Sequence, residues 1–204
     1  MNTQLTLGDV EPYQQIHPYS CGAAALKAVL GHWGEEADEP SLIKEIGVDP
    51  KSGSTCYQVE SAARQRGYMA QTRQFRSIDE LMTFTEQDIP VILAIQSFTR
   101  PGQGHFVVAA DVDGNDVEIM DPNVRGNWRT LTRAELDKRW KFRDRVGVVV
   151  LPPDGQLRGV KPLRRPRGLG DASKSRTVII ALVALAAVAA VTTGVVIYRR
   201  RRVA

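Results

Sequence analysis

Cys21 is a residue that could do chemistry, and it stands where a helix is expected to begin. An alanine- and leucine-rich run follows it as far as Leu30, and these residue types are strong helix formers. Ser20 precedes the run and is expected to cap the helix. The positive end of a helix dipole favours the thiolate form of cysteine, which is the nucleophile. The pattern therefore predicts an activated cysteine, with Gln15 six positions upstream.

A cysteine nucleophile needs a base, and the chain has three histidines, His17, His32 and His105. His105 follows a glycine-rich stretch and stands directly before an apolar run over 106–112. A histidine at the start of such a strand is a candidate for the base. A second apolar run over 117–120 leads into Asp121. The residues between the runs, Asp113-Gly114-Asn115, favour a hairpin turn. His105 and Asp121 are therefore candidates for a base and the group that orients it.

The register of this hairpin decides whether the two side chains meet. A three-residue loop pairs Val112 with Asp116 and Val107 with Asp121. His105 then lies on the same face as Asp121, one diagonal step away, about 7 Å between backbone positions. A two-residue loop would place Asp121 on the opposite face. The predicted base–orienter pair depends on the three-residue loop.

These residues, taken together, resemble the peptidase C39 family and its C39-like relatives, which are papain-like cysteine peptidases that trim leader peptides from bacteriocins. The resemblance covers roughly residues 10–152. The motifs that carry it are Gln15 with Cys21-Gly22-Ala23-Ala24, then Gly104-His105-Phe106, and then Ile119-Met120-Asp121-Pro122. It implies that Cys21 is the nucleophile, His105 the general base and Asp121 the orienting group. The Gln15 side-chain amide and the Cys21 backbone N–H would form the oxyanion hole. Whether double-glycine leaders are cut stays open.

The second cysteine, Cys56, is interpreted as structural, although a disulfide between Cys21 and Cys56 remains possible from sequence. The sequence has no Cys-x-x-Cys or His-x₃-His pattern, so we expect no metal ion and no cofactor. Two alternatives to hydrolysis of a peptide or isopeptide bond stay open. One is a catalytically silent C39-like module that binds peptides at a membrane. The other is an acyl-transferring, transamidating relative.

The remaining pattern predicts an α+β domain over residues 1–152. Helices are expected at Cys21–Trp33, Pro40–Ile46, Tyr57–Arg66, Ile78–Phe84 and from Thr132, with Ser41 and Ser77 as caps. Strands are expected at Ala70–Gln74, Val91–Gln96, Phe106–Val112, Val117–Met120 and Arg145–Leu151. Helices before strands is the papain-like order, a helical half with the cysteine and an antiparallel sheet with the histidine.

The C-terminal part has a different composition. Residues 159–204 hold ten of the 27 Lys+Arg and one acid, a net charge of +9, while residues 1–158 carry −5. The basic tail therefore explains the overall charge, and we expect no nucleic-acid partner. Residues 177–198 are uncharged and span about 33 Å as a helix, enough to cross a bilayer. We therefore predict a linker at 153–176, a transmembrane helix at 177–198 in contact with lipid, and a short basic tail at 199–204.

The predicted location is a membrane, with a single C-terminal anchor. The first residues show no apolar core of a secretory signal, which favours a catalytic domain that faces the cytoplasm. A thiol stays reduced in that compartment. The predicted partner besides the bilayer is a peptide or protein substrate.

Overall fold

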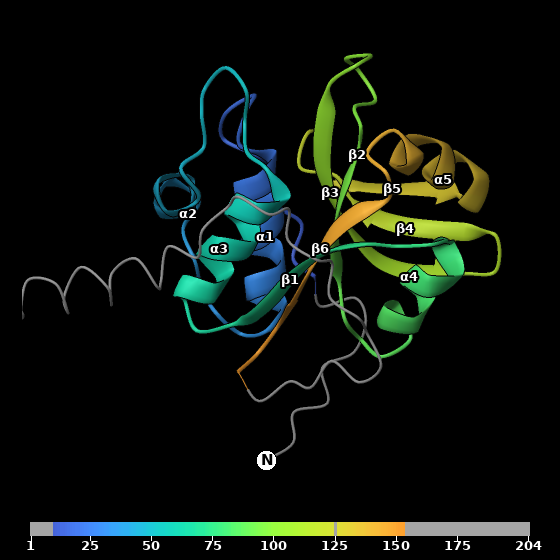
Figure 1. Cartoon of the computed structure of the whole chain (residues 1–204), viewed down its shortest axis with the longest axis horizontal. Helices are drawn as coiled ribbons and strands as arrows, with labels where there is room; N and C mark the ends of the chain where they lie inside the picture. The colour runs from blue at the N-terminus through green and yellow to red at the C-terminus, as the bar shows by residue number, and fades with distance from the viewer. Residues whose placement is uncertain (1–9, 125, 154–204) are drawn as a thin grey trace, which may run out of the picture. The chain divides into compact units, whose positions relative to one another are not determined.

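The computed structural model describes residues 10–124 and 126–153, which form an α+β fold with one antiparallel sheet (Figure 1). In chain order the helices are α1 (Cys21–His32), α2 (Glu39–Ile46), α3 (Cys56–Gln65), α4 (Ile78–Thr85) and α5 (Arg133–Lys141). The strands are β1 (Met69–Gln74), β2 (Val91–Gln96), β3 (Gly104–Asp113), β4 (Asp116–Met120), β5 (Trp128–Thr132) and β6 (Val146–Leu151). Their order in the sheet is β1-β6-β2-β3-β4-β5. The predicted α+β class with a helical part and an antiparallel sheet is confirmed.

Hydrophobic side chains form two core clusters, one on each face of the sheet. Helices α1, α2 and α3 contribute to one cluster, and α4 and α5 contribute to the other. Strand β2 contributes to both clusters. Ile92 belongs to the first cluster, and Val91, Leu93 and Ile95 belong to the second. A strand buried on both faces requires a continuous apolar run rather than an alternating one. Figure 1 shows the first three helices on one side of the sheet and the last two on the other.

Local capping residues set where most helices begin. Ser77 accepts from the Glu80 N–H and caps α4, as predicted. The predicted cap Ser41 is wrong, because Asp38 accepts from the Ser41 N–H and α2 begins at Glu39. Ser20 stands at the N-cap position of α1, but its side chain makes no capping hydrogen bond. The predicted capping role of Ser20 is therefore wrong, and its hydroxyl has another use at the site.

The hairpin between β3 and β4 has a shorter loop than predicted. Asp113 pairs with Asp116, so only Gly114 and Asn115 connect the strands. The expected pairing of Val112 with Asp116 is therefore wrong. Gly114 has a φ of 55°, a left-handed conformation that glycine adopts at little cost and that such two-residue turns require.

A β-bulge at Ala110 restores the register that the short loop would have reversed. The pairing shifts by one residue between Ala109 and Asp111, and Val108 then pairs with Met120. The extra residue in β3 changes the parity of the strand. His105 and Asp121 consequently meet as they would have with a three-residue loop. The predicted contact holds for a different structural reason.

Strand β5 was not expected from the sequence. It pairs with β4 along its whole length, with Ile119 opposite Arg129. Its side chains are half-buried or exposed, so it lacks the apolar alternation that identified the other strands. Trp128, Thr130 and Thr132 are nevertheless residue types that favour strands. This strand propensity is the feature of the sequence that could have indicated β5. The strand adds an arginine beside the candidate site.

The predicted membrane localisation is contradicted. Among the described helices, none is both long and apolar enough to cross a bilayer. The longest of them, α1, has 12 residues, whereas a transmembrane helix needs about 20. We therefore withdraw the single-pass anchor and the cytoplasmic orientation. The predicted transmembrane helix at 177–198 and the basic tail at 199–204 lie outside the described residues, as does the linker beyond Pro153.

Candidate active site

His105 and Asp121 form a buried pair at the start of β3 and the end of β4. The Nε2 atom of His105 lies 2.6 Å from Oδ1 of Asp121, and the two side chains are 8% and 1% exposed. Burial opposes a charge on His105, but the hydrogen bond to Asp121 and then the contact with Cys21 outweigh it and raise the pKa of His105 to about 9. The imidazolium form is therefore stabilised, as a base that must hold a proton requires.

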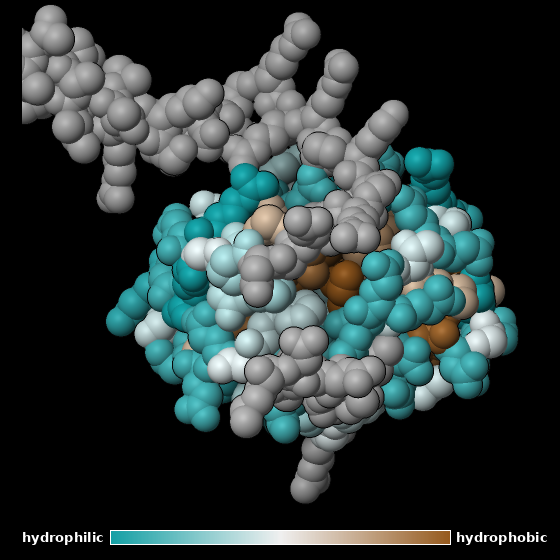
Figure 2. Space-filling view, turned by 90° about the horizontal axis from the view of Figure 1, so that it is seen from below, coloured by the Kyte–Doolittle hydropathy of each residue, from teal (hydrophilic) through white to brown (hydrophobic). Residues whose placement is uncertain are grey.

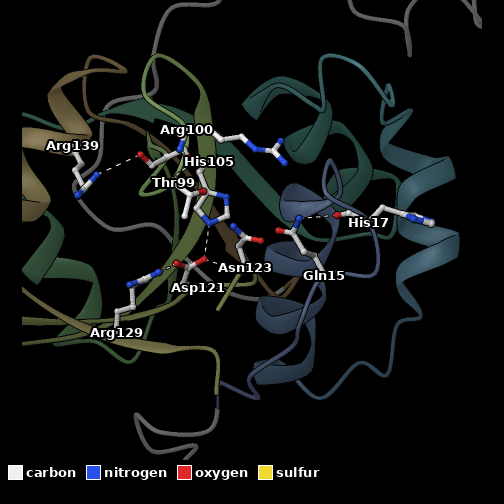
Figure 3. A network of polar contacts seen from close by, with 10 residues as sticks. Gln15, His17, Thr99, Arg100, His105, Asp121, Asn123, Arg129 and Arg139 are labelled. Carbon is white, nitrogen blue, oxygen red and sulfur yellow. Dashed lines mark hydrogen bonds and ion pairs between the residues drawn. The ribbon is translucent and has the colours of Figure 1, made fainter. Parts of the chain in front are cut away.

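Asp121 is held at both of its carboxylate oxygens. Burial raises its pKa, but the hydrogen bond and charge of His105, together with Arg129 and the Asn123 N–H, lower it to about 2. The Asn123 N–H donates to Oδ1 at 2.9 Å, and Nε of Arg129 donates to Oδ2 at 2.6 Å. Figure 3 shows His105, Asn123 and Arg129 around this carboxylate. The arrangement fixes an ionised aspartate against the histidine.

Arg129 is a site residue that the sequence analysis missed, because it lies on the unexpected strand β5. Its guanidinium also stacks on the Phe98 ring, 4.2 Å from the ring centroid. Phe98 lies in the loop between β2 and β3, just before His105 in the chain. Arg129 thus connects this loop with the buried carboxylate of Asp121.

Cys21 is the first residue of α1 and its side chain is half-buried. Its thiol lies close enough to His105 to help raise the pKa of the imidazole. Nε2 of His105 is bound to Asp121, which leaves Nδ1 as the second ring nitrogen. The structure therefore brings together Cys21, His105 and Asp121, which are far apart in the sequence. A cysteine, an imidazole and a carboxylate in this order can perform nucleophilic catalysis.

The helix start leaves no room for a side chain at Gly22. A Cβ there would lie 2.4 Å from Oγ of Ser54 and 3.2 Å from the Phe106 ring. Ser54 leads into α3, and Phe106 follows His105 in β3. The glycine next to Cys21 therefore allows the cysteine helix to approach both the third helix and the strand that carries the histidine.

Gln15 lies on the segment that approaches α1. Its backbone N–H donates to the Pro122 carbonyl at 3.0 Å, which connects this segment with the residue after Asp121. Its side-chain Nε2 donates to the His17 carbonyl at 2.7 Å (Figure 3). An amide nitrogen has two protons, so one proton of Nε2 remains for another acceptor. The neighbouring Gln14 is exposed.

The approach segment is anchored by the buried carboxylate of Glu39. Its Oε1 accepts from the Ser20 hydroxyl at 2.7 Å and from the Ile16 N–H at 3.1 Å. Glu39 is 4% exposed. The Ser20 Oγ accepts from the His17 N–H at 3.1 Å while its proton goes to Glu39, so the hydroxyl is used by these two partners rather than by the N–H groups of α1. Glu39 thereby holds the chain between Gln15 and Cys21, and the sequence analysis did not identify it.

The other histidines and the second cysteine lie in different surroundings. His17 is exposed and stacks on Tyr19, and His32 is buried with Nε2 3.0 Å from the Asp88 carbonyl. Cys21 and Cys56 are both free, so the disulfide left open by the sequence is absent from the structure. Burial raises the pKa of Cys56 to about 12, although the charge of Arg143 opposes this. A raised pKa disfavours the thiolate of Cys56, which is the form that reacts.

The surface seen in Figure 2 is mostly polar, with a smaller apolar area near its middle. Among the described residues, the exposed large hydrophobic side chains are Ile16, Met69 and Phe142. Ile16 is half exposed, at 51%, and lies directly after Gln15. An apolar side chain beside the approach segment is therefore accessible to solvent.

Comparisons with known proteins agree on one family. The sequence model of the Peptidase C39 family matches residues 9–147. The lactococcin-G-processing and transport ATP-binding protein of Lactococcus lactis is 30% identical over 140 residues, which are 69% of this chain but only 18% of that protein. An uncharacterized protein of Methanothermobacter thermautotrophicus is 31% identical over 150 residues, 73% of this chain and 94% of that protein.

A solved structure shares the fold. It is a double-glycine-motif protease from an AMS/PCAT transporter in complex with its leader peptide, with a TM-score of 0.59 and 23% sequence identity. The match covers 73% of this chain and 96% of that chain. At this level of identity the likeness concerns the fold alone.

Proposed function

Since the chain belongs to the peptidase C39 family, we propose that it is a cysteine peptidase that hydrolyses peptide bonds through a thioester at Cys21. The observation that carries this proposal is the buried pair of His105 and Asp121, whose Nε2 and Oδ1 atoms lie 2.6 Å apart, with Cys21 near enough to raise the pKa of the imidazole. This geometry supports the predicted roles of Cys21, His105, Asp121 and Gln15.

In the first step His105 holds the proton of the Cys21 thiol, and the thiolate attacks the carbonyl carbon of the substrate. The C–S bond forms and the carbonyl oxygen becomes an oxyanion. The carbonyl then re-forms, the C–N bond breaks, and the imidazolium gives its proton to the leaving amine. Asp121 keeps the imidazole oriented and stabilises its charged form during both transfers.

In the second step a water molecule replaces the amine. His105 takes a proton from the water as the oxygen attacks the thioester, and a second oxyanion forms. Its collapse breaks the C–S bond, releases a carboxylic acid and returns the thiolate. Because the same histidine serves as base and acid, its protonation must be reversible at the working pH.

The oxyanion would accept hydrogen bonds from the Cys21 backbone N–H and from the Gln15 side-chain amide. The first N–H groups of a helix have no acceptor within the helix, so the Cys21 N–H is available. The bond from Nε2 of Gln15 to the His17 carbonyl orients the amide before substrate binds. Preorganised donors of this kind give the largest single contribution in many acyl-transfer enzymes.

The proposed substrate is a peptide or protein, and leader-bearing peptides are the first class to test. The Lactococcus lactis relative is named for processing lactococcin G, and a solved structure of this fold contains a leader peptide. Transport is not part of the proposal, because this chain aligns with only 18% of the Lactococcus protein.

The test is incubation of the full chain with leader-bearing and unrelated peptides, followed by mass spectrometry of the products. We expect a product pair whose masses sum to the substrate plus one water, with no turnover by Cys21→Ala. Cys56→Ala is the matched control and should keep its activity. Tight binding without turnover would instead indicate a silent module, and transfer of the acyl group to an added amine would indicate a transamidating enzyme.

A further inference from the structure

Four arginines lie in or beside the segment 97–104, which leads directly to His105. Arg100 belongs to this segment. Arg129 and Arg139 each lie with the guanidinium carbon 4.2 Å from the centroid of the Phe98 ring. Arg143 lies against Gly104, where an added Cβ would come within 2.8 Å of its Nη2 atom. The sheet side of the candidate site is therefore strongly basic.

Three of these arginines form no ion pair among the residues that the structure describes, although the charge of Arg139 acts on Glu135. Arg129 pairs with Asp121, and the nearby Arg133 and Arg145 pair with Asp79 and Asp137. No ion pair of the described part includes any of the other three, Arg100, Arg139 and Arg143. We call these three the arginine rim.

The contacts that Arg139 and Arg100 make with segment 97–104 do not explain why so many positive charges lie there. Arg139 donates to the Ser97 carbonyl only at 3.5 Å, a weak bond. Arg100 is anchored through its backbone N–H, which donates to the Ser97 hydroxyl at 3.2 Å. Figure 3 shows the Arg100 side chain extending past His105 toward the side that carries Gln15. In this view its guanidinium lies on the same side of His105 as Gln15.

Arg143 lies against the strand that carries His105. It contacts Gly104, which precedes His105 in β3, and its charge acts on the thiol of Cys56 at the start of α3. Arg143 is exposed. An accessible guanidinium beside the strand of the base can bind an anion, and its planar fork matches a carboxylate.

We propose that the arginine rim selects peptides with a carboxylate within a few residues of the bond that Cys21 attacks. This inference rests on the proposed function, because it names the substrate class of the same site. The rim would raise the local concentration of acidic peptides and bind their carboxylate in the complex. The carboxylate could belong to an aspartate or glutamate side chain or to the C-terminus of a short peptide.

The first test needs no peptide. Cys21 of the full chain is alkylated with iodoacetate, which is anionic, and with iodoacetamide, which is neutral and of similar size. The ratio of the two rate constants reports the electrostatic potential at the thiol. Replacing Arg100 or Arg143 by glutamine should lower this ratio about twofold each at low salt, the effect of one unit charge roughly 8 Å away in water. Added salt should reduce the difference.

A matched control is available in Arg76, which is exposed and has no ion pair in the described part. It follows β1, which is separated from β3 by β6 and β2 in the sheet, so Arg76→Gln should change the ratio much less than a rim substitution. An unchanged ratio in the triple variant of the rim would overturn the inference. Failure of the proposed function would appear differently, as absent or His105-independent alkylation of Cys21 by iodoacetamide.

The second test compares peptides that the wild type cleaves. Glutamate is exchanged for glutamine near the cleaved bond in one pair, and a C-terminal acid for an amide in another. We expect the acidic member of at least one pair to have the higher kcat/KM, mainly through KM, and the triple rim variant to lose this preference. The pair that shows the effect identifies the source of the carboxylate. Equal kcat/KM values within both pairs would contradict the proposal.

Discussion

Replacing Asp121 by asparagine should destabilise the protein by an amount that depends on pH. The substitution keeps the shape of the side chain but removes the negative charge 2.6 Å from Nε2 of His105. In the wild type the pKa of His105 is raised to about 9, above the value of about 6.5 of an unperturbed histidine. The folded state therefore binds a proton more tightly than the unfolded state does.

The magnitude follows from this difference. A shift of one pKa unit corresponds to about 1.4 kcal/mol, so the raised pKa of His105 is equivalent to roughly 3 kcal/mol of unfolding free energy. This stabilisation is fully present below pH 6.5 and is lost as the pH rises through 9. Asp121 gives the larger favourable contribution and Cys21 the next. We therefore expect Asp121→Asn to remove about 2 kcal/mol more at pH 6 than at pH 10.

The assay is urea unfolding of the full chain followed by tryptophan fluorescence at both pH values. Asp121 stays ionised in this range, because its pKa is about 2 and its stabilising effect is lost only when the pH falls from about 3.8 through 2. Asp137→Asn is the matched control, since Asp137 pairs with Arg145 and Lys141 but with no histidine. An equal penalty for Asp121→Asn at pH 6 and pH 10 would refute the reasoning.

Three further predictions concern the residues that surround the thiol. Gln15→Ala should lower kcat by roughly 10²–10³ with little change in KM, because it removes an oxyanion donor, while steady-state kinetics of Gln14→Ala should match the wild type. Glu39→Ala leaves the Ile16 N–H without its acceptor and should cost about 1–3 kcal/mol of unfolding free energy in urea, with slower alkylation of Cys21; unchanged values of both would contradict its anchoring role. Gly22→Ala should lower the Tm through overpacking of about 1–3 kcal/mol, and Ser54→Gly in the same chain should recover part of the loss.

The elements near the nucleophile could be predicted from the sequence because local rules determine them. The cysteine helix follows from helix propensity, and β2 follows from its continuous apolar run. The hairpin shows the limit of such rules. The turn residues fit both a two- and a three-residue loop, and the bulge at Ala110 leaves no trace in the apolar pattern. The contact between His105 and Asp121 was therefore expected with the wrong loop.

The supporting residues could not be predicted because their partners are distant in the chain. Arg129 reaches Asp121 only through the pairing of β5 with β4, and β5 is half-exposed and lacks an alternating pattern. Ser20 stands where a cap is expected, but its oxygen accepts from the His17 N–H and its proton goes to the buried carboxylate of Glu39. Capping rules describe one helix, whereas this bond depends on how α2 packs beside α1.

The central claim, that Cys21 is a nucleophile activated by His105, is tested most directly by single-turnover labelling. The full chain is treated with a limiting amount of iodoacetamide at pH 6, and the modified cysteine is identified by peptide mass spectrometry in the wild type, His105→Ala and Cys56→Ala. The account predicts fast modification of Cys21 in the wild type and in Cys56→Ala, and a loss of at least tenfold in His105→Ala. Equal rates with and without His105, or faster modification of Cys56 than of Cys21, would contradict it.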